Sequence, residues 1–332
     1  MLRTQKGENQ PMVYNPNPNQ GDSLRIQICK RTLYTRLMHY PRYARLIAPA
    51  RPSASLWRLA GGVGLLMAAF LALAYVYSWI ITAVLPDSAW GMDGNGVDEA
   101  TTPWGALTNL FVFAPLIAAL GLAMAVAHRR PLIQLIGPVD LALAQGRRVF
   151  LVVAALYAVM ALIPLPDSFE IQSNLAVRTW ISFLPLAVLG LLIQVSAEEL
   201  IFRGYLQSQL AARFPHPFIW MILPSALFGV LHYQPVLLGN GAWLVVAWAT
   251  LFGLAAADLT ARSGTLGPAI ALHLINNFGA ILFIAPQGSF DGLALYTYPF
   301  GLDHLDMLYA WMPIDLMMLL CSWLAARLAL RV

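Results

Sequence analysis

The sequence predicts an all-α fold, a polytopic membrane helical bundle with about eight transmembrane helices and both termini cytoplasmic. Of the 332 residues, 59% are hydrophobic and only 11% are charged, whereas about a quarter of the residues of a soluble domain are charged. Apolar runs long enough to cross a bilayer recur along the chain. Acidic and basic loops alternate between these runs, as expected when successive loops lie on opposite sides of a membrane.

A membrane-spanning helix needs roughly 20 mostly apolar residues. The candidate segments are 57–84, 104–127, 149–165, 180–200, 218–233, 242–260, 266–285 and 307–328. The third and fifth of them are short or interrupted by proline. The stretch RRPLIQLIGPVDLALAQGRR at 129–148 is apolar but bracketed by arginine pairs. We expect an interfacial or partly buried amphipathic helix there rather than a span.

The loop charges orient the predicted bundle. Residues 85–103 contain four acidic residues and no Lys or Arg, and residues 286–306 contain three aspartates and no basic residue. Residues 129–148, in contrast, contain four arginines. Because Lys and Arg are retained on the cytoplasmic side, we expect the two acidic loops outside and the arginine-rich segment inside.

Residues 1–56 are predicted to form a basic, cytoplasmic and partly disordered N-terminal segment. Ten Lys and Arg fall within residues 1–58, and residues 9–22 are rich in Asn and Pro, a composition typical of disorder. Residues 24–48 could lie on the membrane surface as a basic amphipathic segment. No motif supports a nucleic-acid partner. The expected partner is the lipid bilayer, and we expect a multi-pass protein of a bacterial inner membrane.

Ionisable side chains inside apolar spans are rare and are functional by default. In this chain, the ionisable side chains that fall within predicted spans cluster in the C-terminal half. Glu199 and Arg203 are four residues apart, in the order that favours an ion pair on one helix face. Glu198 points about 100° away from Glu199. We therefore expect Glu198 to lack a local partner and to be free for acid–base chemistry.

A predicted helical hairpin brings further polar residues to the same depth. The turn RFPHP at 213–217 lies midway between Glu198 and His232, so an antiparallel hairpin would set these two side chains level. His273 and Asn277 are four residues apart on a later helix and share a face. The sequence thus predicts a pocket of these four residues that opens to the cytoplasm.

Each of these residues also has a purely structural interpretation. Glu199 and Arg203 could be an ion pair at a helix end, and a histidine within the membrane is often a hydrogen-bonding residue between helices. The amides of Asn276 and Asn277 could serve the same purpose. Asp258 is expected to be a surface or capping carboxylate, and the two histidines of predicted loops, His216 and His304, are expected to be solvated.

Three short motifs resemble those of the CPBP family. EELIFR (Glu198–Arg203), FGVLH (Phe228–His232) and HLINN (His273–Asn277) are similar to the E-E-x-x-x-R, F-x-x-x-H and H-x-x-x-N motifs of these CAAX prenyl proteases of the Ras-converting type and their bacteriocin-processing, Abi-type bacterial relatives. The resemblance covers roughly 180–285. Glycine is common in the family where this chain has Ala255–Ala257. Residues 180–332 are therefore expected to be the catalytic transmembrane core, preceded by N-terminal transmembrane helices in 57–165.

The resemblance implies a membrane-embedded endopeptidase that uses a glutamate and no metal. Glu198, assisted by His232, would activate water, and His273 with Asn277 would stabilise the oxyanion. Glu199 and Arg203 would support the site. A zinc ion remains an alternative, because two histidines and a glutamate are a plausible ligand set, although the sequence has no H-E-x-x-H motif. The expected substrate is a membrane-associated peptide or protein.

Two other functions compete with proteolysis. In a proton- or cation-coupled transporter, Glu198, His232 and His273 would line the transport path. Transporters commonly have paired repeats with broken helices in both halves, whereas the polar residues here lie in one half. A non-catalytic scaffold or immunity protein of the same fold is the third possibility, and the intact motif positions argue against it.

Overall fold

The computed structural model describes residues 40–85, 100–163, 169–288 and 290–332. The chain divides into two units, Met1–Pro41 and Arg42–Val332, and every helix from α2 onward belongs to the second. The expected disorder of 9–22 lies outside the described residues, as do most of the expected surface helix of 24–48 and most of the acidic loop 85–103.

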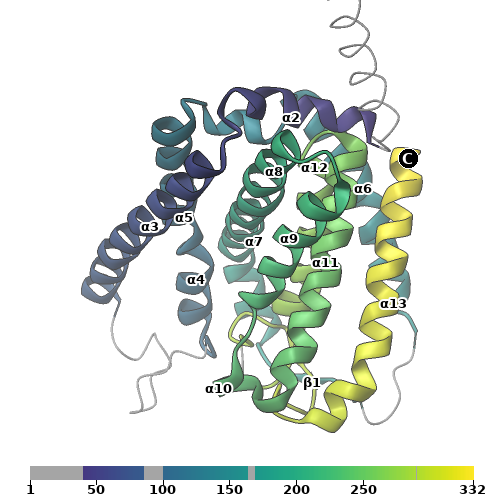
Figure 1. Ribbon diagram of the computed structural model, residues 1–332. Helices are drawn as coiled ribbons and strands as arrows, with labels where there is room; N and C mark the ends of the chain where they lie inside the picture. Colours follow the sequence, from purple (N-terminus) through teal and green to yellow (C-terminus); the bar gives the residue numbers. More distant parts are fainter. Residues whose placement is uncertain (1–39, 86–99, 164–168, 289) are drawn as a thin grey trace, which may run out of the picture. The chain divides into compact units, whose positions relative to one another are not determined.

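Helices dominate the second unit (Figure 1). The α-helices are α2 (Ala44–Ala50), α3 (Leu56–Val84), α4 (Pro103–Phe111), α5 (Phe113–Ala123), α6 (Val139–Met160), α7 (Val177–Glu199), α8 (Ser208–Arg213), α9 (Pro217–Val230), α10 (Pro235–Leu238), α11 (Ala242–Ser263), α12 (Gly267–Asn277) and α13 (Leu305–Leu330). π-Helical turns form η4 (Met124–His128), η7 (Leu200–Gln207) and η9 (Phe278–Phe283). Short 3₁₀ turns are η2 (Arg51–Ser53), η5 (Leu132–Leu135) and η8 (Gly239–Gly241).

Every predicted span corresponds to a helix. Six helices of the described chain are long and apolar enough to cross a membrane, and the helices at Pro217–Val230 and Gly267–Phe283 are apolar but shorter. This confirms an all-α, polytopic membrane bundle. The number of spans and the side on which the termini lie stay predictions.

The second half of 129–148 is a partly buried amphipathic helix, as predicted, but it is continuous with the span that follows it instead of separate from it. Only η5 is a separate short helix there, and α6 begins at Val139 rather than at 149, as one continuous helix through the arginine pair. The reason is that a buried stripe continues through this stretch, at Ala142, Gln145 and Val149, while Arg147 and Arg148 lie on the exposed face. A helix keeps such a stripe at intervals of three and four residues.

Close contacts between helix backbones hold the bundle together. At Gly229 of α9, an added Cβ atom would lie 2.6 Å from the carbonyl oxygen of Val246 on α11. At Gly267 of α12, it would collide with the carbonyl oxygen of Ala142 on α6. Small residues at helix contacts permit this approach in membrane bundles.

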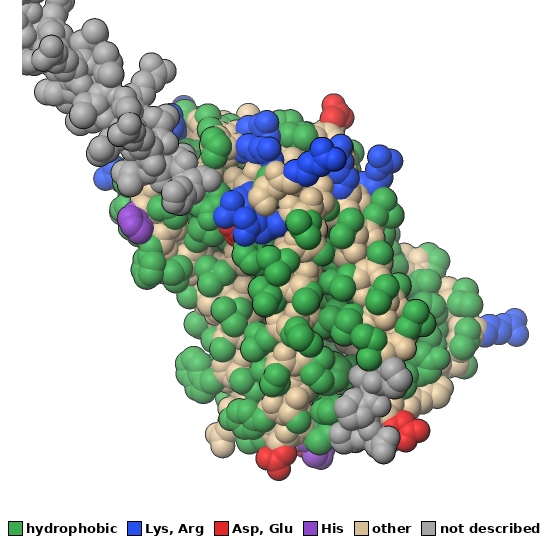
Figure 2. Space-filling model, turned by 90° about the vertical axis from the view of Figure 1, so that its right-hand side faces the viewer, with side chains coloured by type: hydrophobic (Ala, Val, Ile, Leu, Met, Phe, Trp, Pro, Cys, Tyr) green, Lys and Arg blue, Asp and Glu red, His purple; other side chains and the backbone are tan. Residues whose placement is uncertain are grey.

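The surface matches a protein set in a bilayer. Figure 2 shows a broad band of hydrophobic side chains, with most of the visible Lys and Arg at one end and the few visible Asp and Glu near the two ends. α2 and the C-terminal residue lie at the basic end, and α10 with β1 (Gln172–Ser173) at the opposite end (Figure 1). There β1 pairs antiparallel with β3 (Tyr296–Thr297), which pairs parallel with β2 (Ile284–Ala285). The protein is thus an integral, multi-pass membrane protein.

Candidate functional site

The ion pair between Glu199 and Arg203 is at the centre of the site. The Arg203 Nη1 and Glu199 Oε1 atoms are 3.0 Å apart, which confirms the pairing predicted from their spacing. The exposed fractions of Glu199 and Arg203 are 0% and 1%. The guanidinium carbon of Arg203 also lies 4.6 Å from the ring centre of Phe228 on α9, a distance suited to a cation–π contact. Opposite charges and the aromatic face offset part of the cost of this burial, while Glu199 Oε2 and Arg203 Nη2 are buried without a hydrogen-bond partner among the described residues.

His273 on α12 lies between the two carboxylates. Its Nδ1 atom is 2.8 Å from Glu199 Oε1, and its Nε2 atom is 3.4 Å from Glu198 Oε2. His273 is 3% exposed and Glu198 is 9% exposed. When Nδ1–H donates to the Glu199 carboxylate, the ring is fixed with Nε2 facing Glu198. The cluster therefore has the order Arg203, Glu199, His273, Glu198.

Glu198 has a local partner, contrary to the sequence-based expectation. Gln194, one turn earlier on α7, donates a hydrogen bond from Nε2 to Glu198 Oε1 at 3.4 Å. Gln194 was not predicted as a site residue because its side chain is neutral, although its four-residue spacing from Glu198 indicates a shared helix face. Glu198 thus contacts both a histidine and an amide.

A row of amides continues from Gln194 across two further helices. Asn277 Nδ2 donates to Gln194 Oε1 at 3.3 Å, and Asn276 Nδ2 donates to Asn277 Oδ1 at 3.2 Å. The hydroxyl of Tyr157 on α6 donates to Asn276 Oδ1 at 3.3 Å. Both asparagines are therefore linked to the carboxylate cluster, and Tyr157 is a further residue that the sequence did not indicate.

His232 joins the cluster through an aromatic ring. The predicted hairpin exists, because the chain reverses between Arg213 and Pro217. However, α9 ends at Val230, so His232 lies just beyond the helix and donates from Nδ1 to the carbonyl oxygen of Phe228 at 2.7 Å. The Phe228 ring lies 4.6 Å from the His232 ring and 6.1 Å from the His273 ring, centre to centre. Phe228 is thus the contact that His232 and His273 share.

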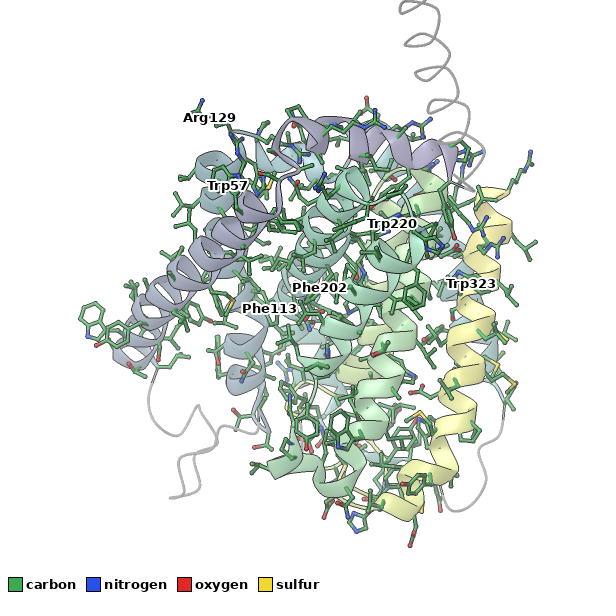
Figure 3. The ribbon with its side chains drawn as sticks, in the orientation of Figure 1. Trp57, Phe113, Arg129, Phe202, Trp220 and Trp323 are labelled. Atoms are coloured by element: carbon green, nitrogen blue, oxygen red, sulfur yellow. The ribbon has the colours of Figure 1, made fainter. Side chains whose placement is uncertain are left out.

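Two helices change type beside site residues. α7 passes into π-helical η7 directly after Glu199, and α12 passes into π-helical η9 directly after Asn277. Single π-helical turns inside α-helices are rare and occur frequently at functional sites. Figure 3 shows Phe202 of η7 inside the bundle, where its ring packs edge-on against Phe228 at 5.1 Å.

The expected surface position of Asp258 is wrong. Asp258 is 7% exposed, and both of its carboxylate oxygens accept from Arg262 Nε, at 2.8 and 2.9 Å. Trp323 of α13, labelled in Figure 3, donates from Nε1 to Asp258 Oδ2 at 3.0 Å. The carboxylate is buried because it joins α11 to α13. His216 and His304 are exposed, as predicted.

A second buried histidine, His128, escaped the sequence analysis. Its Nδ1 atom lies 3.0 Å from Ser53 Oγ and 3.1 Å from Gln209 Nε2, and its Nε2 atom lies 2.9 Å from the hydroxyl of Tyr205. His128 is 4% exposed. The sequence offered little signal, because His128 directly precedes an arginine pair at a helix end. We call these four residues the His128 cluster.

A crevice among the described residues lies apart from these polar clusters. An apolar crevice of about 530 Å³ lies between α3, η7–α8 and α9, and its lining includes none of the polar residues above. No three His, Cys, Asp or Glu side chains in the described ranges are grouped so as to hold a metal ion. Both ring nitrogens of His273 face carboxylate oxygens.

Comparison with known proteins gives a family match and one curated relative. An uncharacterized protein of Bacillus subtilis (strain 168), YyaK, is 26% identical over 256 residues, which cover 74% of this chain and 84% of that protein. No solved structure matches significantly. Residues 179–279, which contain all six predicted site residues, match the family described as type II CAAX prenyl endopeptidase Rce1-like, and the resemblance inferred from the three motifs is thereby confirmed.

Proposed function

We propose that the chain is a CAAX-protease-like intramembrane endopeptidase that hydrolyses a peptide bond of a membrane-associated substrate. The observation that carries the proposal is the buried arrangement of Arg203, Glu199, His273 and Glu198 among apolar helices. An ion pair with a histidine directed at a second carboxylate is costly to bury, and a purely structural bundle does not need it. The family match over 179–279 supports the same reaction class.

In the proposed reaction, Glu198 takes a proton from a water molecule, assisted by His232, and the water oxygen bonds to the carbonyl carbon of the scissile amide. The displaced electron pair moves to the carbonyl oxygen, where N–H donors of His273 and Asn277 stabilise the negative charge. Collapse of the tetrahedral intermediate breaks the C–N bond. The proton held by Glu198 passes to the leaving nitrogen.

The contacts of His273 support this division of roles. Because Glu199 accepts from Nδ1 at 2.8 Å, a doubly protonated His273 keeps that bond while Nε2–H is available to an oxyanion. Arg203 balances the charge of Glu199, so Glu199 acts by orienting His273. Glu198 is the more exposed of the two carboxylates and is the one a water molecule can reach.

The decisive experiment compares wild type with Glu198→Gln. Both proteins are purified, reconstituted into liposomes and incubated with a peptide library that includes prenylated CAAX peptides and bacteriocin leader sequences. We expect cleavage by wild type and a loss of roughly 10³-fold in the variant, since general acid–base catalysis contributes about 10²–10⁴-fold. Equal product from both proteins would rule out the protease mechanism. Ion flux that depends on Glu198, without cleavage, would instead identify a transporter.

A second experiment addresses zinc. We propose that catalysis requires no metal cofactor, with Glu198 rather than a metal ion activating the water. Cleavage is therefore expected to persist after prolonged treatment with a strong chelator, followed by removal of the chelator. Loss of activity that added zinc restores would replace the glutamate mechanism by metal-assisted hydrolysis.

We further propose that the protein resides in a bacterial inner or cell membrane. The apolar helices and the Bacillus relative support this location. Fractionation of cells that express a tagged chain tests this location. We expect detergent, but not alkaline carbonate, to extract the chain from the membrane fraction. Release by carbonate would argue against integral insertion.

A further inference from the structure

The hydrogen bonds that lead from Tyr157 through three amides to Glu198 all run in one direction, from donor to acceptor. Tyr157 donates to Asn276, Asn276 to Asn277, Asn277 to Gln194, and Gln194 to the carboxylate of Glu198, over distances of 3.2–3.4 Å. Every donor in this row points toward the carboxylate. Hydrogen bonds aligned in this way polarise one another, so the negative charge of Glu198 and the row stabilise each other.

Gln194 has only one amide orientation that satisfies both neighbours. Its carbonyl oxygen accepts from Asn277, and its Nε2 donates to Glu198. If the amide were flipped, its oxygen would face the carboxylate oxygens and its NH₂ group would face the NH₂ group of Asn277. The two contacts therefore lock Gln194, and Gln194 in turn fixes Asn277 with Nδ2 toward the cluster. Asn277 Nδ2 carries a second N–H, which suits an oxyanion.

We propose that Gln194 is a positioning residue that holds the Glu198 carboxylate and the Asn277 amide in fixed relative positions. The water-activating group and an oxyanion donor then act on the same substrate carbonyl. This inference rests on the proposed peptidase function. Gln194 lies one helical turn before Glu198 and is half-buried, and it joins α7 to α12 at the site.

Two substitutions separate the two contacts of Gln194. Gln194→Met keeps the length of the side chain and removes both hydrogen bonds. Gln194→Glu keeps an acceptor for Asn277 but places a second carboxylate against Glu198. The matched control is Gln207→Met, because Gln207 lies on the same continuous helix, is fully buried and donates from Nε2 to the carbonyl oxygen of Ala257 at 3.1 Å.

With reconstituted full-length protein, we expect Gln194→Met to lower kcat about tenfold and to leave KM within about twofold, because one aligned hydrogen bond is worth up to about a tenfold factor. Gln207→Met is expected to lower thermal stability while kcat of the folded protein stays at the wild-type value. Unchanged kcat in Gln194→Met would overturn the assignment. So would an equal fall in both variants, because it would reflect packing alone.

The pH profile provides a readout that a structural role would not move. In Gln194→Glu, a second carboxylate opposes the ionisation of Glu198, which already faces His273 and interacts electrostatically with Arg203. Glu199 stays paired with Arg203 and His273. The acid limb of the pH–rate profile is expected to move to higher pH in this variant, with recovery of much of the activity in alkaline buffer. An unshifted acid limb would contradict the proposal.

A chemical readout works even if wild type cleaves no peptide. Dicyclohexylcarbodiimide, a membrane-soluble reagent, modifies protonated carboxyl groups, and mass spectrometry measures its attachment at Glu198. Loss of the Gln194 donor leaves the carboxylate less stabilised, so we expect labelling several times faster in Gln194→Met than in wild type or Gln207→Met. Equal labelling would overturn the positioning role. Failure of cleavage together with this difference would refute the peptidase function alone.

Discussion

The protein buries two histidines that are equally well bonded but have different kinds of partners. His273 is 3% exposed and His128 is 4% exposed, and each has a polar group at both ring nitrogens. His273 faces two carboxylates, whereas His128 faces a serine, a glutamine and a tyrosine. Burial and hydrogen bonding therefore do not distinguish the two histidines. The charge of their partners does, because a carboxylate attracts a proton on the ring far more strongly than a neutral hydroxyl or amide.

The neutral partners of His128 also determine its role in the fold. Gln209 donates to Nδ1, so Nε2 carries the hydrogen and donates to the Tyr205 hydroxyl, which donates onward to the carbonyl oxygen of Leu59. These residues come from η4, α3 and the helix that continues from Glu198. The His128 cluster thus ties the N-terminal helices to the C-terminal helices, as polar groups do between helices in membranes.

The largest effect is expected from removing the positive charge of the site. Arg203→Met leaves Glu199 buried without its counter-ion, and breaking a buried pair in this way costs about 3–5 kcal/mol. The control is Arg262→Met, which removes an ion pair of the same spacing whose arginine side chain is 26% exposed. A smaller loss is expected there, because Asp258 keeps the hydrogen bond from Trp323 and the arginine of this pair is partly hydrated. Unfolding in a denaturing detergent titration measures both, and equal losses would contradict the distinction.

Exchanging each histidine for glutamine tests the comparison directly. His273→Gln removes a donor that touches both carboxylates, so we expect peptide cleavage to fall roughly 10²–10³-fold. His128→Gln is expected to keep the activity of the folded protein within about threefold and to lower its stability. Cleavage rates are normalised to the monodisperse fraction in size-exclusion chromatography. A comparable loss of activity in both variants would mean that the His128 cluster takes part in catalysis.

Helical spacing predicted much of the fold and the charged part of the site. It identified the apolar helices, the Glu199–Arg203 pair and the shared face of His273 and Asn277. It could not predict the π-helical turns after Glu199 and Asn277, because these depend on tertiary packing rather than on local pattern. Nor could it predict that His273 contacts both carboxylates, because His273 and Glu199 lie on different helices and are 74 residues apart in sequence.

The residues that the sequence did not indicate are mostly neutral. Gln194 and Tyr157 are recognised as site residues only from the side chains that they contact on other helices. His128 precedes an arginine pair, a pattern typical of a solvent-exposed helix end. Asp258 was misplaced for a related reason, because Trp323, which covers it, comes from the last helix. Sequence reasoning thus finds charges in apolar surroundings and misses neutral side chains whose partners lie on other helices.

A smaller effect is expected where α3 meets the His128 cluster. A Cβ atom at Gly62 would collide with the Tyr205 hydroxyl and would lie 2.9 Å from His128 Nε2. Gly62→Ala must displace the cluster, and overpacking of this kind costs about 1–3 kcal/mol. Gly61→Ala is the matched control, because no atom lies within 4 Å of the added carbon. If the two variants unfolded at the same detergent concentration, the close packing of α3 against this cluster would be refuted.

The smallest expected quantity is the coupling energy between Tyr205 and His128, which separates a hydrogen bond from packing within the His128 cluster. Tyr205→Phe keeps the ring and leaves His128 Nε2–H without its acceptor, which costs about 1–3 kcal/mol. Since both residues belong to one network, the cost of Tyr205→Phe should shrink in a His128→Phe background by at least about 0.5 kcal/mol. Additive losses in this double-mutant cycle would show that the two side chains act independently. Because Tyr205 lies on the same continuous helix as Glu198, the cleavage rate of folded Tyr205→Phe also tests the central distinction. An unchanged rate is expected if the His128 cluster holds the helices together and takes no part in the chemistry proposed for the residues around Glu198.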